Sequence, residues 1–124
     1  MRILIVDDSV SMRRVERSML TDMGFSDIKE AADGSEALKM VSSGKFDLIL
    51  LDWKMPVLSG LDTLKRLKAS PDFKSIPVVM VTSESNKTKI LEAIQSGAAN
   101  YIIKPFSDEV LKEKLEPFLG KETA

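Results

Sequence analysis

The sequence predicts an α/β fold in which a five-stranded parallel sheet is covered by helices on both faces. Short apolar runs alternate with longer segments whose apolar residues recur every three or four positions, which is the pattern of strands alternating with helices. The runs are continuously apolar, as strands buried on both faces are. With 124 residues, 44% of them hydrophobic, the chain is long enough to bury the core of one domain.

Five apolar runs define the predicted sheet. We expect strands at residues 3–6, 28–32, 48–51, 78–81 and 101–103. The run at 48–51 is the clearest, and the one at 28–32 is the weakest because charged residues interrupt it. Pro77 directly precedes the fourth run, where a proline can begin a strand.

The segments between these runs read as helices. Met12, Val15, Met19 and Met23 recur on one helical face, and Gly24 is placed to end that helix. The later helices are predicted from similar spacings at residues 37–41, 61–67, 90–94 and 110–118, with Gly44 and Gly97 as ends of the second and fourth, and Ser107 or Asp108 as the N-cap of the last.

Composition excludes several kinds of chemistry. The chain has no cysteine and no histidine, so thiolate nucleophiles, zinc–sulfur sites and an imidazole base are excluded. A net charge of −1 argues against a general electrostatic grip on nucleic acid. No apolar stretch approaches the ~20 residues of a membrane span, and the first run is too short for a signal peptide. We therefore expect a cytoplasmic protein with no membrane insertion and no direct nucleic-acid contact.

Polar residues follow four of the five predicted strands. Asp7 and Asp8 follow the first, Asp52 the third, Thr82 the fourth and Lys104 the fifth. In an open parallel sheet the carboxyl ends of the strands meet at one edge, where ligands bind. The topology therefore predicts that three carboxylates, a hydroxyl and an ammonium share one crevice.

Each of these residues also has an ordinary structural role open to it. Asp7, Asp8 or Ser9 could simply cap the first helix. Thr82 suits a strand end, and a single lysine such as Lys104 is usually solvated. These ordinary roles explain the set poorly, because each residue would then have to lie at the same edge of the sheet independently of the others.

Elementary electrostatics narrows the chemistry of such a crevice. Three carboxylates repel one another and raise each other's pKa, and a hard divalent cation relieves that repulsion. Mg²⁺ prefers oxygen ligands and takes one or two carboxylates together with phosphate oxygens. A carboxylate can itself be the nucleophile that accepts a phosphoryl group, and Lys104 would supply a second positive charge. The sequence thus favours Mg²⁺ as cofactor and aspartyl phosphorylation as chemistry.

Over its whole length the chain resembles the receiver domains of bacterial response regulators, and among them the chemotaxis regulators. The motifs that carry the resemblance are Asp7-Asp8-Ser9, Met12-Arg13-Arg14, Asp33-Gly34 with Glu36-Ala37-Leu38, Asp52-Trp53-Lys54-Met55-Pro56 with Gly60, Thr82, Gly97-Ala98, and Tyr101 with Lys104-Pro105-Phe106. The resemblance implies a flavodoxin-like strand order of 2-1-3-4-5. It also implies a receiver domain at residues 1–120 and a short C-terminal tail at 121–124.

The resemblance implies roles for the carboxylates. Asp52 would be the phosphoacceptor. Asp8, Asp52 and the backbone carbonyl of Lys54 would bind Mg²⁺ directly, and Asp7 would bind it through water. Such a cluster would act by positioning the phosphoryl group and neutralising its charge.

It also implies how the domain would switch. Thr82 and Lys104 would contact the phosphoryl oxygens. On phosphorylation the Thr82 hydroxyl would move toward the phosphoryl group and Tyr101 would turn inward, changing the surface formed by the fourth helix, fifth strand and fifth helix. The peptide between Lys104 and Pro105 is expected to be cis, which is uncommon even for proline.

One position departs from the family pattern. Lys54 stands two residues after Asp52, where the best-known chemotaxis regulator has asparagine. We expect Lys54 and Glu84 to tune the lifetime of the aspartyl phosphate, by pairing across the mouth of the site. The departure also bears on any phosphatase partner that depends on an amide at this position.

The implied partners are a histidine kinase, most simply the chemotaxis kinase, and the flagellar motor switch protein. A phosphatase is a further possible partner. The resemblance also implies that the protein is a monomer. The protein would promote its own phosphoryl transfer without being a conventional enzyme. A phosphorelay receiver with a different partner has the same site. An aspartyl-phosphate phosphatase is disfavoured, because such enzymes place an acid where Lys54 stands, and a flavodoxin-like cofactor binder is disfavoured by the charge of Asp7-Asp8.

Overall fold

The computed structural model, described here for residues 1–119, contains five parallel strands in the order β2-β1-β3-β4-β5. The strands are β1 (Arg2–Val6), β2 (Asp27–Ala31), β3 (Leu48–Leu51), β4 (Val78–Thr82) and β5 (Asn100–Ile103). The predicted strand order is confirmed. The tail predicted at residues 121–124 lies outside the described residues.

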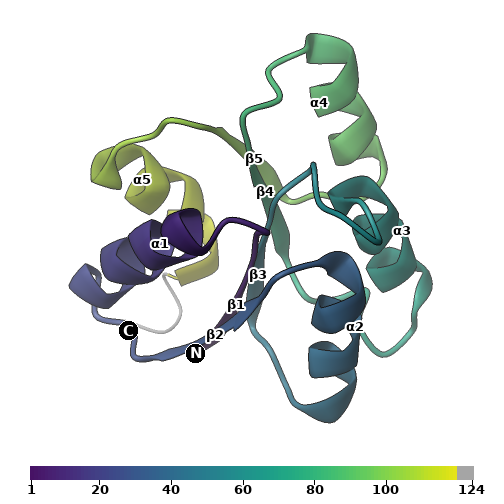
Figure 1. Ribbon diagram of the computed structural model, residues 1–124, viewed down its shortest axis with the longest axis horizontal. Helices are drawn as coiled ribbons and strands as arrows, with labels where there is room; N and C mark the ends of the chain where they lie inside the picture. Colours follow the sequence, from purple (N-terminus) through teal and green to yellow (C-terminus); the bar gives the residue numbers. More distant parts are fainter. Residues whose placement is uncertain (120–124) are drawn as a thin grey trace.

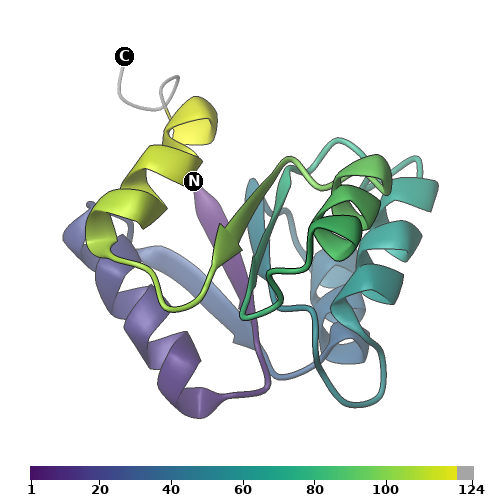
Figure 2. The same cartoon turned by 90° about the horizontal axis from the view of Figure 1, so that it is seen from above.

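Five helices cover the sheet on both faces (Figures 1 and 2). The helices are α1 (Val10–Asp22), α2 (Gly34–Ser43), α3 (Gly60–Ala69), α4 (Lys87–Gln95) and α5 (Asp108–Leu119). Figure 1 shows α1 and α5 together on one side of the sheet and α2, α3 and α4 on the other. The three-layer arrangement follows from parallel strands, which need crossover connections and buried faces.

Neighbouring residues of each strand belong to different cores. In β1, Leu4 packs in the core that includes Leu64 of α3, whereas Ile3 packs in the core that includes Leu111 of α5. Because successive side chains of a strand point to opposite faces, a continuous apolar run supplies both cores. This is why β1, β3, β4 and β5 could be predicted from continuity, whereas β2, which carries charged residues, gave a weaker signal.

The helix ends follow the capping rules. The N-cap side chains of α1 to α4 each accept a hydrogen bond from a backbone amide in the first turn; the caps are Ser9, Asp33, Ser59 and Asn86. Of the two caps predicted for α5, Ser107 fills the role, because its hydroxyl accepts from the amide of Val110 at 3.2 Å. Gly24 and Gly97, with φ of 100° and 112°, follow the ends of α1 and α4, where a residue without a β-carbon is favoured.

The apolar face predicted on the first helix is only partly buried. Met19 and Met23 are half-buried and pack against the core that includes Leu111 of α5, whereas Val15 is 42% exposed. The fully buried residues of α1 are Glu16 and Leu20. The most buried line of the helix therefore runs beside the predicted face, and a glutamate in that line is the reason that apolar spacing alone did not find it.

Candidate phosphorylation and metal site

The predicted site residues converge on one edge of the sheet. Asp7 and Asp52 directly follow β1 and β3, Thr82 is the last residue of β4, and Lys104 directly follows β5. Asp7 is 1%, Asp52 8% and Thr82 1% exposed. The site therefore lies within the packed body of the domain, at its carboxyl edge.

Three carboxylates form a compact cluster there. Asp7, Asp8 and Asp52 each offer an oxygen, and these oxygens lie within 4.8 Å of one another. Asp7 and Asp52 are buried, whereas Asp8 is exposed. The site offers only oxygen donors and is open to solvent at Asp8. Both features suit Mg²⁺, which prefers oxygen ligands and keeps several of its waters.

Lys104 supplies the positive charge of the cluster. Its Nζ lies 2.6 Å from Oδ2 of Asp7 and 3.4 Å from Oδ2 of Asp52. The peptide from Lys104 to Pro105 is cis, as expected. One ammonium thus neutralises part of the charge of two buried carboxylates, the condition for keeping them ionised away from water.

Burial and charge shift the pKa values of this group in opposing ways. Burial raises the pKa of Asp52, and the ammonium of Lys104 only partly offsets the effect. Burial alone would lower the pKa of Lys104, but the hydrogen bond to Asp7 and the charges of Asp52 and Asp7 outweigh it, so the pKa is raised. Lys104 therefore stays charged, while Asp52 holds a proton more readily than an ordinary aspartate.

Backbone amides orient the two buried carboxylates. The amide of Trp53 donates to Oδ1 of Asp52 at 2.7 Å, and the amide of Ser9 donates to Oδ1 of Asp7 at 2.9 Å. Ser9 is the cap of α1, accepting from the amide of Met12. Of the three residues that could have capped the first helix, Asp7, Asp8 and Ser9, it is Ser9 that does so.

The loop from Asp52 to α3 depends on close backbone packing. The amide of Gly60 donates to the carbonyl of Trp53 at 2.7 Å, and a β-carbon on Gly60 would overlap the carbonyl oxygen of Asp52. Within the same loop, Val57 has a φ of 69°, a strained value for a β-branched residue. The close approach explains why a glycine stands at position 60. It also holds the backbone of Asp52 in place.

Thr82 and Tyr101 are linked through Glu84. The hydroxyl of Thr82 accepts from the amide of Glu84 at 3.2 Å, and the hydroxyl of Tyr101 donates to the carbonyl of Glu84 at 2.7 Å. Tyr101 is only 7% exposed, so it already lies inward. Burial, with smaller contributions from Glu84 and Asp52, raises the pKa of Tyr101 to about 12, which keeps it a neutral donor.

The expected ion pair between Lys54 and Glu84 is not formed. Within residues 1–119, no salt bridge involves either side chain. Lys54 is exposed, and Oε1 of Glu84 accepts from the amide of Asn86 at 3.2 Å instead. The carboxylate of Glu84, which was expected to pair with Lys54, thus accepts a hydrogen bond from a backbone amide in its own loop.

An arginine pair that the sequence analysis did not single out braces α1 near the site. Nε of Arg13 lies 3.0 Å and Nε of Arg17 lies 2.6 Å from the carboxylate of Glu30 on β2. Arg13 also donates to the carbonyl of Asp7 at 2.6 Å. Burial would raise the pKa of Glu30, but the hydrogen bonds of Arg17 and Arg13 outweigh it and the pKa is lowered. The four-residue spacing of two arginines was the signal available in the sequence.

Glu16 is the second residue that sequence reasoning missed. It is 1% exposed, and its Oε2 has no hydrogen-bond partner among residues 1–119. Burial, followed by the charge of Asp7, raises the pKa of Glu16 to about 8. A carboxyl group therefore lies uncharged, at neutral pH, on the inner face of α1 below the acidic cluster.

Comparison with known proteins agrees with this geometry. Residues 3–116 match the family model described as the response regulator receiver domain. The chemotaxis protein CheY of Pseudomonas aeruginosa is 47% identical over 116 residues, with 94% of each chain covered. CheY1 of Helicobacter pylori strain J99 is 43% identical over 121 residues, covering 97% of this chain and 98% of the relative.

Solved structures show the same architecture. CheY4 of Vibrio cholerae superimposes with a TM-score of 0.87 at 36% identity, covering 95% of this chain and 98% of that one. A sensor histidine kinase receiver domain from Pseudomonas aeruginosa, solved with magnesium coordinated in its active site cleft, has a TM-score of 0.86 at 27% identity and covers 96% and 97%. The chain belongs to the response regulator receiver family, in its CheY-like branch.

Proposed function

We propose that this response regulator is phosphorylated on Asp52 by a histidine kinase and signals in chemotaxis. The observation that carries the proposal is the position of the Asp52 carboxylate, 3.4 Å from the ammonium of Lys104 and in one cluster with Asp7 and Asp8. An oxygen of Asp52 would form the new O–P bond as the P–N bond of a phosphohistidine breaks. The imidazole is the leaving group, and no external oxidant or reductant is needed.

Residues of this chain would position the phosphoryl group and neutralise its charge during that transfer. Lys104 would neutralise charge on the phosphoryl group, and the Thr82 hydroxyl, at the end of the neighbouring strand, would contact the phosphoryl oxygens. Asp8, Asp52 and the backbone carbonyl of Lys54 would hold Mg²⁺, with Asp7 acting through water, and the ion would supply further charge neutralisation. The cluster of carboxylates described above fits that ion. The protein would promote its own phosphorylation and dephosphorylation without turning over a separate substrate.

The output surface would be the face formed by α4, β5 and α5. Three large apolar side chains are exposed on its first two elements, with exposures of 54% for Leu91, 42% for Ile94 and 42% for Ile103. Tyr101 on β5 ties this face to the loop after Thr82 through the carbonyl of Glu84. A phosphoryl group that attracts the Thr82 hydroxyl would therefore disturb the loop leading into α4, shifting the population of states that a partner binds.

The assignment to chemotaxis rests on the names of the relatives, which are chemotaxis proteins at 40–47% identity. The flagellar motor switch protein is the partner we propose. The test is to phosphorylate the protein from an autophosphorylated chemotaxis kinase and to measure its affinity for the peptide of the motor switch protein. We expect the phosphorylated form to bind more tightly than the Asp52→Asn variant, and no gain in affinity would instead favour a phosphorelay receiver with another partner.

A further inference from the structure

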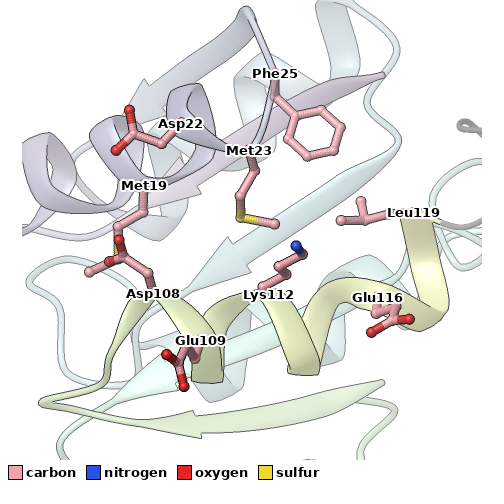
Figure 3. A pocket seen from close by; sticks show the side chains of 9 residues that line it. All are labelled: Met19, Asp22, Met23, Phe25, Asp108, Glu109, Lys112, Glu116 and Leu119. Carbon is pink, nitrogen blue, oxygen red and sulfur yellow. The ribbon is translucent and has the colours of Figure 1, made fainter.

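A groove lies between α1 and α5 (Figure 3). These two helices cover the face of the sheet opposite to α4 (Figure 1). The groove encloses about 750 Å³. Its apolar floor consists of Met19 and Met23 of α1, Phe25 of the following loop, and Leu119 of α5. Figure 3 shows these side chains directed toward the space between the two helices.

The floor of this groove belongs to the methionine stripe of α1. Met19 and Met23 stand with Val15 in the series that the spacing placed on one helical face. They are half-buried at the edge of the core, whereas Glu16 and Leu20 are fully buried. A second hollow, which shares Met19 with the first, continues along α1 to the 42% exposed Val15. The apolar stripe thus continues from the edge of the core, against which Met19 and Met23 pack, onto the surface at Val15.

The rim of the groove is strongly acidic. Asp22 on α1 faces Asp108, Glu109 and Glu116 on α5, with Lys112 the single basic lining residue. In the part of the chain that the structure describes, none of these four carboxylates lies within 4.0 Å of a cationic side chain. An apolar floor between unneutralised carboxylates is complementary to a segment that is apolar on one side and basic on the other.

The walls of the groove decide the conformation of the occupant. Both walls are helices, whose interior backbone groups are already hydrogen-bonded, so the groove offers no strand edge with which an extended peptide could pair. A helix, which satisfies its own backbone hydrogen bonds and can present one apolar face, suits such a groove. Methionine side chains are flexible and adapt to such helical partners. We propose that the α1–α5 groove binds a basic amphipathic helix of a partner protein, at a surface separate from α4 and β5.

The experiment uses the full chain labelled with ¹³C at its methionine methyl groups. The probe is a designed helical peptide of about 18 residues with leucines along one face and lysines on the other, and its control carries glutamate in place of every lysine. We expect the methyl signals of Met19 and Met23 to shift in a saturable way with the lysine peptide only. Because rim charges steer the ligand, binding should weaken as ionic strength rises.

Matched charge reversals test the location. The double variant Glu109→Lys/Glu116→Lys changes two exposed rim residues, and Glu92→Lys/Glu113→Lys makes the same change in net charge at exposed positions outside the groove. We expect the rim variant to raise the Kd at least about tenfold and the control variant to change it by less than about twofold. Equal weakening by both variants would show a net-charge effect and would overturn the proposal.

Three other outcomes would also contradict it. Binding of the glutamate peptide with equal affinity would remove the role of the acidic rim. Nuclear Overhauser contacts from Met19 or Met23 to residues 120–124 in the peptide-free protein would make the chain's own end the occupant. Methyl shifts that depend on protein concentration alone would make a second copy the occupant.

Discussion

Nζ of Lys104 lies 2.6 Å from an oxygen of Asp7 and donates a hydrogen bond to it, across 97 positions of sequence. The two residues follow β5 and β1, which are separated in the sheet by β3 and β4. The bond therefore links the ends of two strands that lie on either side of β3, the strand that Asp52 directly follows. The contact keeps a positive charge beside two buried carboxylates.

Replacing Lys104 by methionine should destabilise the protein when no divalent cation is present. The substitution leaves the carboxylates of Asp7 and Asp52 buried without their cation, at a cost of about 3 kcal/mol in the free energy of unfolding. The loss should shrink as the pH falls, because Asp52, whose pKa is raised, becomes neutral. Urea unfolding followed by circular dichroism measures it, with the exposed Lys45→Met as control, and an equal loss in both variants would contradict the account.

Adding Mg²⁺ should stabilise the wild type, and this stabilisation should require Asp8. A ligand at 100 times its Kd adds about 2.7 kcal/mol to the free energy of unfolding. Asp8 is exposed, so Asp8→Asn should fold normally without the ion and lose most of the gain with it. Thermal unfolding with and without Mg²⁺ is the measurement, and an undiminished gain in Asp8→Asn would place the ion elsewhere.

Glu16→Gln should stabilise the protein above neutral pH and have little effect near pH 5. The carboxyl group of Glu16 has a pKa raised from 4.5 to about 8 in the fold. The folded state therefore binds more protons than the unfolded state in this window, and wild-type stability falls as the pH rises through it. Above the window the gain for glutamine should be on the order of 4 kcal/mol.

The control for this prediction is Glu113→Gln, at an exposed position of α5. It should leave the dependence of stability on pH unchanged. Denaturant unfolding between about pH 5 and pH 9 covers the window in which the two protonation states exchange. A gain for Glu16→Gln that is constant over this range would mean that packing, and not ionisation, explains the effect.

Lys54 and Glu84 should affect the lifetime of the phosphoryl group independently. The family resemblance implies that both side chains face the phosphoryl group on Asp52, so we expect alanine at either position to admit water and to shorten the lifetime. Because the two side chains are not paired, their effects should add in the double variant to within about 0.5 kcal/mol of activation free energy. Loss of phosphoryl group followed over time in the three variants measures this; strong coupling would mean that the pair forms after phosphorylation, and unchanged rates would remove both residues from the tuning role.

The sheet edge could be predicted from sequence because it depends on topology. Parallel strands place their carboxyl ends together, so residues directly after apolar runs, such as Asp52 and Lys104, meet whatever the details of packing. The hydrophobic continuity of β1 and β3 is enough to locate those ends. Capping by Ser9 and Ser107 is likewise local and readable from the chain.

The remaining features depend on tertiary contacts that spacing does not encode. Nothing in the sequence around Glu16 indicates that a carboxyl group replaces an apolar side chain on the buried face of α1, so the apolar spacing pointed to the neighbouring face of Val15 and the methionines instead. The pairing of Lys54 with Glu84 also failed, because the amide of Asn86 offers the carboxylate a nearer partner. Local hydrogen bonds of this kind outcompete longer-range pairs between exposed charges.

The most direct test of the central claim is the intact mass of the protein after incubation with acetyl phosphate. The account predicts a gain of one phosphoryl group, about 80 Da, in the presence of Mg²⁺, lost on treatment with hydroxylamine as an acyl phosphate is. The gain should be absent when EDTA replaces Mg²⁺ and absent in Asp52→Asn. A wild type that gains no hydroxylamine-labile phosphoryl group, or an Asp52→Asn variant that gains it equally, would contradict the assignment of Asp52.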